Sequence, residues 1–231
     1  MNFIKRNALW LFPIFFLLLF APFSVAIDME IASRAYSEAN KSFSTNNFYD
    51  IVFRFGCIPA QASCGIAVIY FLLSYYSSRY HAYRKTALAV ALPMIIGAGL
   101  LTITFFKEHW GRPRPRQVEQ FGGTQAFRPF YVPSLSKPPV PSKSFPSGHS
   151  TCGFYFFIFF FLGRRFQNRL LESIGLLAAF GLGIFLCITR IVQGGHFLSD
   201  TLFAAFLMWE TAYFVDWLVF EYAPLTQRLA K

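Results

Sequence analysis

Long apolar runs separated by short polar segments make up most of this chain. Six stretches come close to the roughly 20 apolar residues that a helix needs to cross a bilayer. They are Ala8 to Ile27, Ile51 to Tyr76, Ala87 to Phe106, Ser150 to Gly163, Leu170 to Thr189 and Phe197 to Phe220. The fourth is short, and we expect it to extend through Arg164 and Arg165, whose apolar stems can lie along the membrane. The pattern predicts an all-α fold, a bundle of six transmembrane helices.

Composition agrees with a membrane protein. Of the 231 residues, 55% are hydrophobic and only 14% are charged, whereas a soluble domain carries about 25% charged residues. A bundle of this length leaves no room for a second domain, so we expect one domain over residues 1–231. The cysteines lie in apolar segments without metal-ligand spacing, and we expect no metal and no cofactor. These residues are Cys57, Cys64, Cys152 and Cys187.

Basic residues predict how the bundle is oriented, because short cytoplasmic loops collect Lys and Arg. Alternate connections and the chain ends fall on one side and carry ten of them. The residues on this side are Lys5, Arg6, Arg79, Arg84, Lys85, Arg164, Arg165, Arg169, Arg228 and Lys231. Both termini are therefore expected inside, and the loop from Asp28 to Asp50 outside. An alternative is that the first helix is a signal peptide cleaved after Ala26; we favour a retained helix, because its apolar run is long.

A second basic cluster lies on the opposite, outer side. The segment from Lys107 to His149 contains seven basic residues and only two acidic ones, Glu108 and Glu119. The basic residues are Lys107, Arg112, Arg114, Arg116, Arg128, Lys137 and Lys143. Positive charge on the unfavoured side of a membrane indicates an anionic ligand, although a solvated loop is the simpler alternative. The Pro-rich part, from Pro129 to Pro146, predicts an extended loop over the outer mouth of the bundle.

The last of three chemically informative segments contains a histidine and an aspartate. His196 and Asp200 are four residues apart, so on a helix they lie on one face, one turn apart. The carboxylate can then hold the imidazole in one tautomer and stabilise its positive charge. A membrane-surface histidine is often only structural, but the nearby Arg190 favours an anion site. Gly194 and Gly195 would let the backbone approach a ligand closely.

The other two segments supply groups that suit a phosphate. Ser147, Gly148 and His149 open the fourth helix, where free backbone N–H groups favour an anion; Ser147 either caps this helix or binds the anion. Lys107 and Arg114 add an ammonium and a guanidinium. Their neighbours Arg112 and Arg116 flank this pair and either contribute to binding or merely face anionic headgroups; we favour the flanking role for both.

Together the three segments resemble the signature of the type 2 phosphatidic acid phosphatase superfamily. Its pattern is Lys, six residues, Arg-Pro; then Pro-Ser-Gly-His; then Ser-Arg, five residues, His, three residues, Asp. This chain supplies the following positions: Lys107, Arg114, Pro115, Pro146, Ser147, Gly148, His149, Arg190, His196 and Asp200. The one departure is Thr189 in place of Ser, which keeps the hydroxyl. The resemblance covers about residues 87–220.

The resemblance implies a metal-independent phosphoryl transfer through a phosphohistidine. His196 would attack phosphorus, Asp200 would orient it, and His149 would protonate the leaving oxygen. The phosphate oxygens would be held by Lys107, Arg114, Ser147, Gly148 and Arg190. Such a transition state needs positioned positive charge, which agrees with the residues themselves.

The resemblance also implies a membrane-embedded substrate. The expected partners are a lipid phosphate and the membrane, with no nucleic acid and no obligate protein partner. The superfamily suggests lipid A, undecaprenyl diphosphate, phosphatidylglycerol phosphate or phosphatidic acid, and the loop from Phe121 to Tyr131 resembles that of bacterial lipid A phosphatases. We expect a bacterial inner membrane with the site on the periplasmic face. Phosphotransfer to another hydroxyl, non-catalytic lipid binding and a glucose-6-phosphatase-like role remain alternatives.

Overall fold

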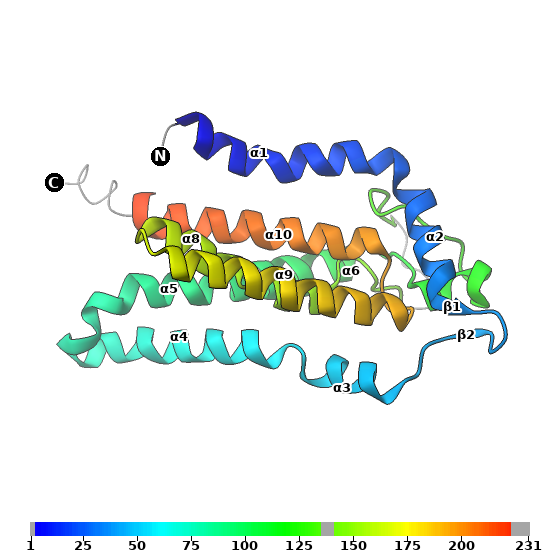
Figure 1. Cartoon of the computed structure of the whole chain (residues 1–231), viewed down its shortest axis with the longest axis horizontal. Coiled ribbons are helices and arrows are strands. Elements are labelled where there is room, and N and C mark those ends of the chain that lie inside the picture. The colour runs from blue at the N-terminus through cyan, green and yellow to red at the C-terminus, as the bar shows by residue number, and fades with distance from the viewer. Residues whose placement is uncertain (1–2, 135–140, 223–231) are drawn as a thin grey trace.

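The fold is a bundle of long helices that run roughly parallel to one axis (Figure 1). The structure is a computed structural model that describes residues 3–134 and 141–222. Lys137, Arg228 and Lys231, which the charge pattern assigned to loops and to the C-terminal end, lie outside the described residues. The all-α prediction is confirmed except for one small hairpin.

The first half of the chain forms three helical columns and that hairpin. Its elements, in order, are α1 (Phe3–Phe20), η1 (Ala21–Phe23), α2 (Ser24–Ala35), β1 (Tyr36–Ser37), β2 (Ser42–Phe43), α3 (Asn47–Phe55), α4 (Ile58–Tyr76), η2 (Ser78–Tyr83), α5 (Arg84–Pro93), η3 (Met94–Phe106) and α6 (Lys107–His109). The strands pair antiparallel, with Tyr36 opposite Phe43. The loop expected from Asp28 to Asp50 is thus largely ordered: α2 continues through Asp28 to Ala35, and α3 begins at Asn47.

The second half forms the loop region and three further columns. Its elements are η4 (Pro115–Gln117), η5 (Glu119–Phe121), α7 (Gly148–Phe154), α8 (Phe157–Arg165), α9 (Arg169–Val192), α10 (Leu198–Trp217) and η6 (Leu218–Tyr222). In the described part of the chain, five helical segments are long and apolar enough to cross a membrane: Trp10–Ala35, Asn47–Tyr76, Ser78–His109, Arg169–Val192 and Leu198–Tyr222. They correspond to five of the six predicted helices, and the protein is an integral membrane protein.

The remaining predicted helix, the fourth along the chain (Ser150 to Gly163), is present as the broken pair α7 and α8. Each of these two helices is too short to count as a membrane span. The pair occupies the centre of the bundle, where Tyr155, Ile158 and Leu162 are fully buried. Close packing explains how α7 fits there: a Cβ on Gly153 would lie 2.5 Å from the Cα of Gly183 on α9. Small residues let membrane helices approach one another in this way.

Ion pairs within the protein hold Arg165 at the end of α8. Arg165 donates to both carboxylate oxygens of Asp216, at 2.6 and 2.7 Å, and to Glu221 at 3.1 Å. This pairing ties α8 to α10 and η6 at one end of the bundle.

The two ends of the bundle differ in what they carry. The start of α1, the end of α10 and the α4–α5 and α8–α9 connections lie at one end (Figure 1). The hairpin, α2, α6 and the loops after α6 lie at the other. This arrangement follows the alternation that the basic residues predicted, and it brings the three chemically informative segments to a single end.

Candidate active site

Backbone contacts between the three segments bring them together at this end. Ser147 donates its backbone N–H to the carbonyl of Asp200 at 3.2 Å, and Arg116 donates its own to the carbonyl of Gly194 at 3.2 Å. Lys107 lies against the start of α7, because a Cβ on Gly148 would be 3.6 Å from its Cε. The residues predicted from the motifs therefore surround one place.

His196 lies just before α10 and Asp200 in its first turn. His196 is buried, and its Nδ1 is 3.7 Å from Asp200 Oδ2, close enough for an ion pair but too far for a hydrogen bond. Among the described residues, Nδ1 has no hydrogen-bond partner. Burial lowers the pKa of His196 to about 3, against the opposing effect of Asp200. The imidazole is consequently neutral near pH 7, as a nucleophile must be.

Asp200 is held by groups other than His196. Its Oδ2 accepts from the Ser144 hydroxyl at 2.6 Å and from the backbone N–H of Phe197 at 2.8 Å. Its Oδ1 accepts from Arg112 Nη1. Because three donors fix the carboxylate, its position beside His196 is determined before any ligand arrives.

Arg112 contradicts the expectation that it faces lipid headgroups. Its side chain is fully buried and donates Nη2 to Asp28 Oδ2 at 2.8 Å in addition to its bond to Asp200. Ser199 closes the cluster, accepting from Arg112 Nη1 at 2.7 Å and donating its backbone N–H to Asp28 Oδ1 at 2.8 Å. A buried guanidinium needs paired charge, and two carboxylates provide it.

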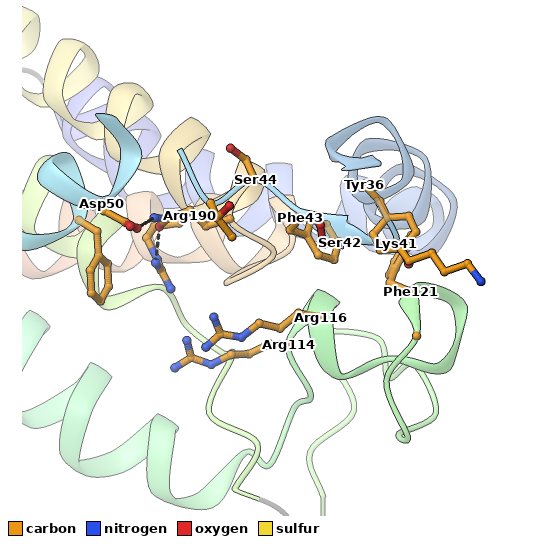
Figure 2. Close-up of a pocket in the computed structure, with 14 residues that line it drawn as sticks. Tyr36, Lys41, Ser42, Phe43, Ser44, Asp50, Arg114, Arg116, Phe121 and Arg190 are labelled. Carbon is orange, nitrogen blue, oxygen red and sulfur yellow. Dashed lines mark hydrogen bonds between the residues drawn. The ribbon is translucent and has the colours of Figure 1, made fainter. Parts of the chain in front are cut away.

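Three other arginines converge on an open cavity of about 740 Å³ (Figure 2). Arg114 and Arg116 enter it side by side from the loop after α6, and Arg190 enters from the end of α9. Arg190 lies over the Phe53 ring at 4.5 Å and donates to Gln193 at 2.6 Å. Burial and the neighbouring charge of Arg116 lower the pKa of Arg114. Like charges held this close indicate a site for an anion.

Glycine is required where Arg190 meets the turn before His196. A Cβ on Gly195 would lie 2.2 Å from Arg190 Nη2, so a side chain there would displace the guanidinium. Gly194 adopts φ +59°, a conformation that favours glycine. The sequence predicted that a ligand would approach the backbone of these two glycines closely. In the structure the group closest to Gly195 is the Arg190 side chain.

Ser147 lies at the start of α7 and bonds within that helix. Ser147 is fully buried and caps the helix: its hydroxyl accepts from the Ser150 backbone N–H at 3.4 Å and from the Ser150 hydroxyl at 2.8 Å. Of the two predicted roles, capping is the one observed. Lys107 Nζ donates to the carbonyl of Lys143 at 3.1 Å, which keeps the ammonium next to this helix start.

His149 is half-buried beside α3. Its Nε2 is 3.0 Å from the Phe53 carbonyl, to which it donates, and its ring stacks on the Phe53 ring at a centroid distance of 4.6 Å. Burial, and secondarily the charge of Arg190, lower the pKa of His149 to about 4. This histidine is therefore neutral near pH 7.

The sequence reasoning missed Asp28 and the structural role of Arg112. Asp28 lies in the first predicted outer loop, 172 positions before Asp200 in the chain, and nothing in its local pattern distinguishes it. The available signal was indirect: a carboxylate next to an apolar membrane run is a functional candidate.

The geometry and the comparisons with known proteins agree on a class. Residues 87–223, more than half of the chain, match the PAP2 superfamily. The chain therefore belongs to this superfamily, as the motifs predicted, and it is a phosphoric ester hydrolase.

Three relatives of this chain are all named lipid A 4'-phosphatase. A lipid A 4'-phosphatase of Francisella tularensis subsp. novicida is 37% identical over 158 residues, which cover 67% of this chain and 67% of that protein. Lipid A 4'-phosphatases of Rhizobium etli and Rhizobium leguminosarum are each 32% identical over 127 residues, 54% of this chain. Those matches span 47% and 52% of the Rhizobium proteins, about half of their length. No solved structure matches the chain.

Proposed function

We propose that this protein is a membrane lipid phosphatase that works through a phosphohistidine on His196 and needs no metal ion. The observation that carries the proposal is a buried neutral histidine beside a fixed aspartate. The turn before His196 packs against Arg190, which lines the cavity together with Arg114. A nucleophile, its charge partner and cationic binding groups are what phosphoryl transfer requires.

In the first step the lone pair of His196 Nε2 attacks phosphorus. Nε2 is the available nitrogen because Nδ1 faces Asp200. The P–N bond forms as the bond from phosphorus to the lipid oxygen breaks, and His149 gives its proton to that oxygen. The phosphorylated imidazole gains positive charge, which the Asp200 carboxylate stabilises; the 3.7 Å separation is expected to shorten as this charge develops.

In the second step water replaces histidine at phosphorus. His149, now neutral, accepts a proton from the water as its oxygen attacks, and the P–N bond breaks to release inorganic phosphate and neutral His196. The phosphate oxygens are held through both steps by Lys107, Arg114 and Arg190, with the Gly148 amide and Ser147 at the start of α7. Ser147 would have to exchange its capping bond for the phosphate.

His149 must be protonated to act first as an acid, and its surroundings in the protein oppose this. Its pKa of about 4 reflects burial and the charge of Arg190. A bound phosphate dianion offsets that positive charge, so we expect the pKa of His149 to rise when substrate binds. Release of the Phe53 carbonyl would then free Nε2 to face the leaving oxygen.

The positions of Asp28 and Arg112 support a role in holding Asp200. They do not line the cavity, yet Arg112 bridges Asp28 and Asp200 in the buried cluster. We propose that they are positioning residues, which keep the Asp200 carboxylate aimed at His196.

Among the lipids expected from the motifs, a lipid A-type phosphomonoester is the substrate that the names of the relatives favour. We propose that the protein resides in a bacterial inner membrane, with the cavity on the periplasmic face. The alternation of basic residues supports this orientation.

Purified protein in detergent tests the proposal. Phosphate release should be measured in excess chelator from lipid A, undecaprenyl diphosphate, phosphatidylglycerol phosphate and phosphatidic acid, beside a His196→Ala control. Release that requires His196 and withstands chelator is expected. Release that needs a divalent ion, or that persists in His196→Ala, would contradict the mechanism.

A further inference from the structure

The cavity is much larger than the transferred phosphate requires. Pockets of about 300–1,000 Å³ suit ligands of many atoms, and this one measures about 740 Å³. It extends from Arg114 and Arg190 past Arg116 to the hairpin formed by β1 and β2 (Figure 2). The extra space lies on the side where the rest of a headgroup would project.

Arg116 provides positive charge that the superfamily motif does not include. Its side chain is exposed and points into the cavity next to Arg114 (Figure 2). Among the described residues its guanidinium has no hydrogen-bond or ion-pair partner, and its backbone is fixed by the bond to the Gly194 carbonyl. Its backbone is fixed and its guanidinium is unpaired, so the guanidinium is available for a ligand.

The charge balance leaves Arg116 in excess. A phosphomonoester carries at most about two negative charges, and Arg114 and Arg190 already line the cavity beside Arg116. Lys41 lines it as well. Asp50 is the one carboxylate among the described residues that line the cavity, and it accepts from Gln193 at 2.9 Å. A further anionic group on the ligand would match the remaining positive charge.

The far wall comes from a part of the chain outside the superfamily match. The rings of Tyr36, Phe43 and Phe121 pack with centroids 5.3–5.5 Å apart, which fixes the hairpin to η5. Phe43 also covers Gly194, where a Cβ would be 2.4 Å from its ring. Since the hairpin precedes residue 87, where the match begins, its contacts can set specificity without altering the catalytic residues.

The hairpin and its surroundings present groups that bind hydroxyls. Ser42, Ser44 and Thr45 are hydroxyl-bearing residues of the lining, and Asp50 and Gln193, which bond to each other, are its carboxylate and amide residues. Such side chains combine donors and acceptors, as a ring with several hydroxyl groups requires. An acyl chain or a bare glycerol would use few of them.

From these observations we infer that the cavity is a headgroup subsite for a phosphorylated sugar, in which Arg116 binds a second anionic group of the substrate. The transferred phosphate lies between Arg114 and Arg190, and the sugar extends toward the hairpin. This inference rests on the proposed function and adds the class of headgroup and a residue that determines specificity.

The experiment compares Arg116→Ala with Arg34→Ala. Arg34 has the same charge and lies on α2 at the same end of the bundle, but it does not line the cavity. Three substrates are needed: a glycolipid with two sugar phosphates, the same glycolipid with only the hydrolysed phosphate, and a lipid diphosphate without sugar. For Arg116→Ala, KM for the doubly phosphorylated glycolipid should rise about 10- to 100-fold, the usual effect of losing one charge-assisted contact. KM for the other two substrates should change less than about threefold. Arg34→Ala should leave KM for all three substrates unchanged.

Three results would overturn the inference: an equal loss on all substrates, which would place Arg116 at the transferred phosphate; no loss on any; or a loss confined to the lipid diphosphate. Failure of the proposed function would appear separately, as wild-type protein that hydrolyses none of the lipids. Calorimetric binding of the lipid-free sugar bisphosphate to wild type and Arg116→Ala tests the subsite in that case, because it needs no turnover. Equal affinity for the two proteins would reject it.

Discussion

Replacing Asp28 with Asn tests whether the buried cluster supports Asp200, the proposed charge partner of His196. The variant keeps the shape and an acceptor for the Ser199 N–H but removes the negative charge facing Arg112. Arg112 and Asp28 are both fully inaccessible in their side chains, at 0% exposure. Removing one partner of a buried ion pair costs about 3–5 kcal/mol. Because Asn keeps part of the hydrogen bonding, we expect a loss of about 3 kcal/mol of unfolding free energy, at the lower end of that range.

Activity should fall as well, and in a particular way. With Asp28 neutral, Arg112 is left with Asp200 as its one carboxylate and draws its negative charge away from His196. Less charge then remains to stabilise the phosphorylated imidazole. We expect kcat to fall by about tenfold or more, equivalent to at least about 1.4 kcal/mol in the barrier. KM should change little, since Asp28 does not line the cavity.

Glu30→Gln provides a matched control on the same helix. Glu30 pairs with Arg34 four residues later, but the two side chains are 59% and 77% exposed. Exposed pairs of this kind contribute about 0.3–0.5 kcal/mol. Unfolding in detergent should be followed together with steady-state kinetics for both variants. If Asp28→Asn matched Glu30→Gln in stability and in kcat, the reasoning about the cluster would be refuted.

Three further predictions concern the cavity, the acid and the orientation. Gly195→Ala should displace the Arg190 guanidinium and raise KM about tenfold, the effect of one weakened charge-assisted contact. Gly181→Ala, within the preceding helix α9, meets nothing within 4 Å and should leave KM unchanged. Equal KM values for the two variants would contradict the proposed contact. Because the pKa of His149 is about 4, its protonated fraction grows as pH falls, so kcat/KM should increase from pH 7 toward pH 5. His149→Gln should lose that increase while keeping any effect of substrate ionisation, and an unaltered profile would exclude His149 as the acid. A cysteine at exposed Thr124 should react with an impermeant thiol reagent added to intact cells or spheroplasts; reaction only after lysis would invert the orientation.

The helices could be predicted from the sequence because local apolar runs determine where they form. Apolar runs of membrane length are sufficient to form helices in a bilayer, where each backbone group must be bonded within its own segment. Five predicted spans correspond to helices of the structure. The segment from Ser150 to Gly163 was harder, since the break between Phe154 and Phe157 and the burial of this segment depend on packing against α9.

The site residues also divide into those that local motifs predict and those whose roles depend on contacts with distant parts of the chain. Motif spacing identified His196, His149 and the cationic residues, and the structure brings them to one end of the bundle. Arg112 was interpreted wrongly because its surroundings are set by Asp28 and Ser199, which come from distant parts of the chain. Likewise, no local pattern shows that the hairpin from Tyr36 to Phe43 reaches the turn at Gly194, because aromatic packing and a glycine contact create that wall.

The central claim is that His196 carries the phosphoryl group, and trapping that group tests it most directly. A lipid substrate with radiolabelled phosphorus should be mixed with the protein and quenched in alkali within milliseconds. A phosphorus–nitrogen bond survives alkali and breaks in acid, so we predict an alkali-stable, acid-labile label on the peptide that contains His196, absent from His196→Ala. A label that lies on another residue, or turnover in single-turnover mixing without any labelled protein, would contradict the account.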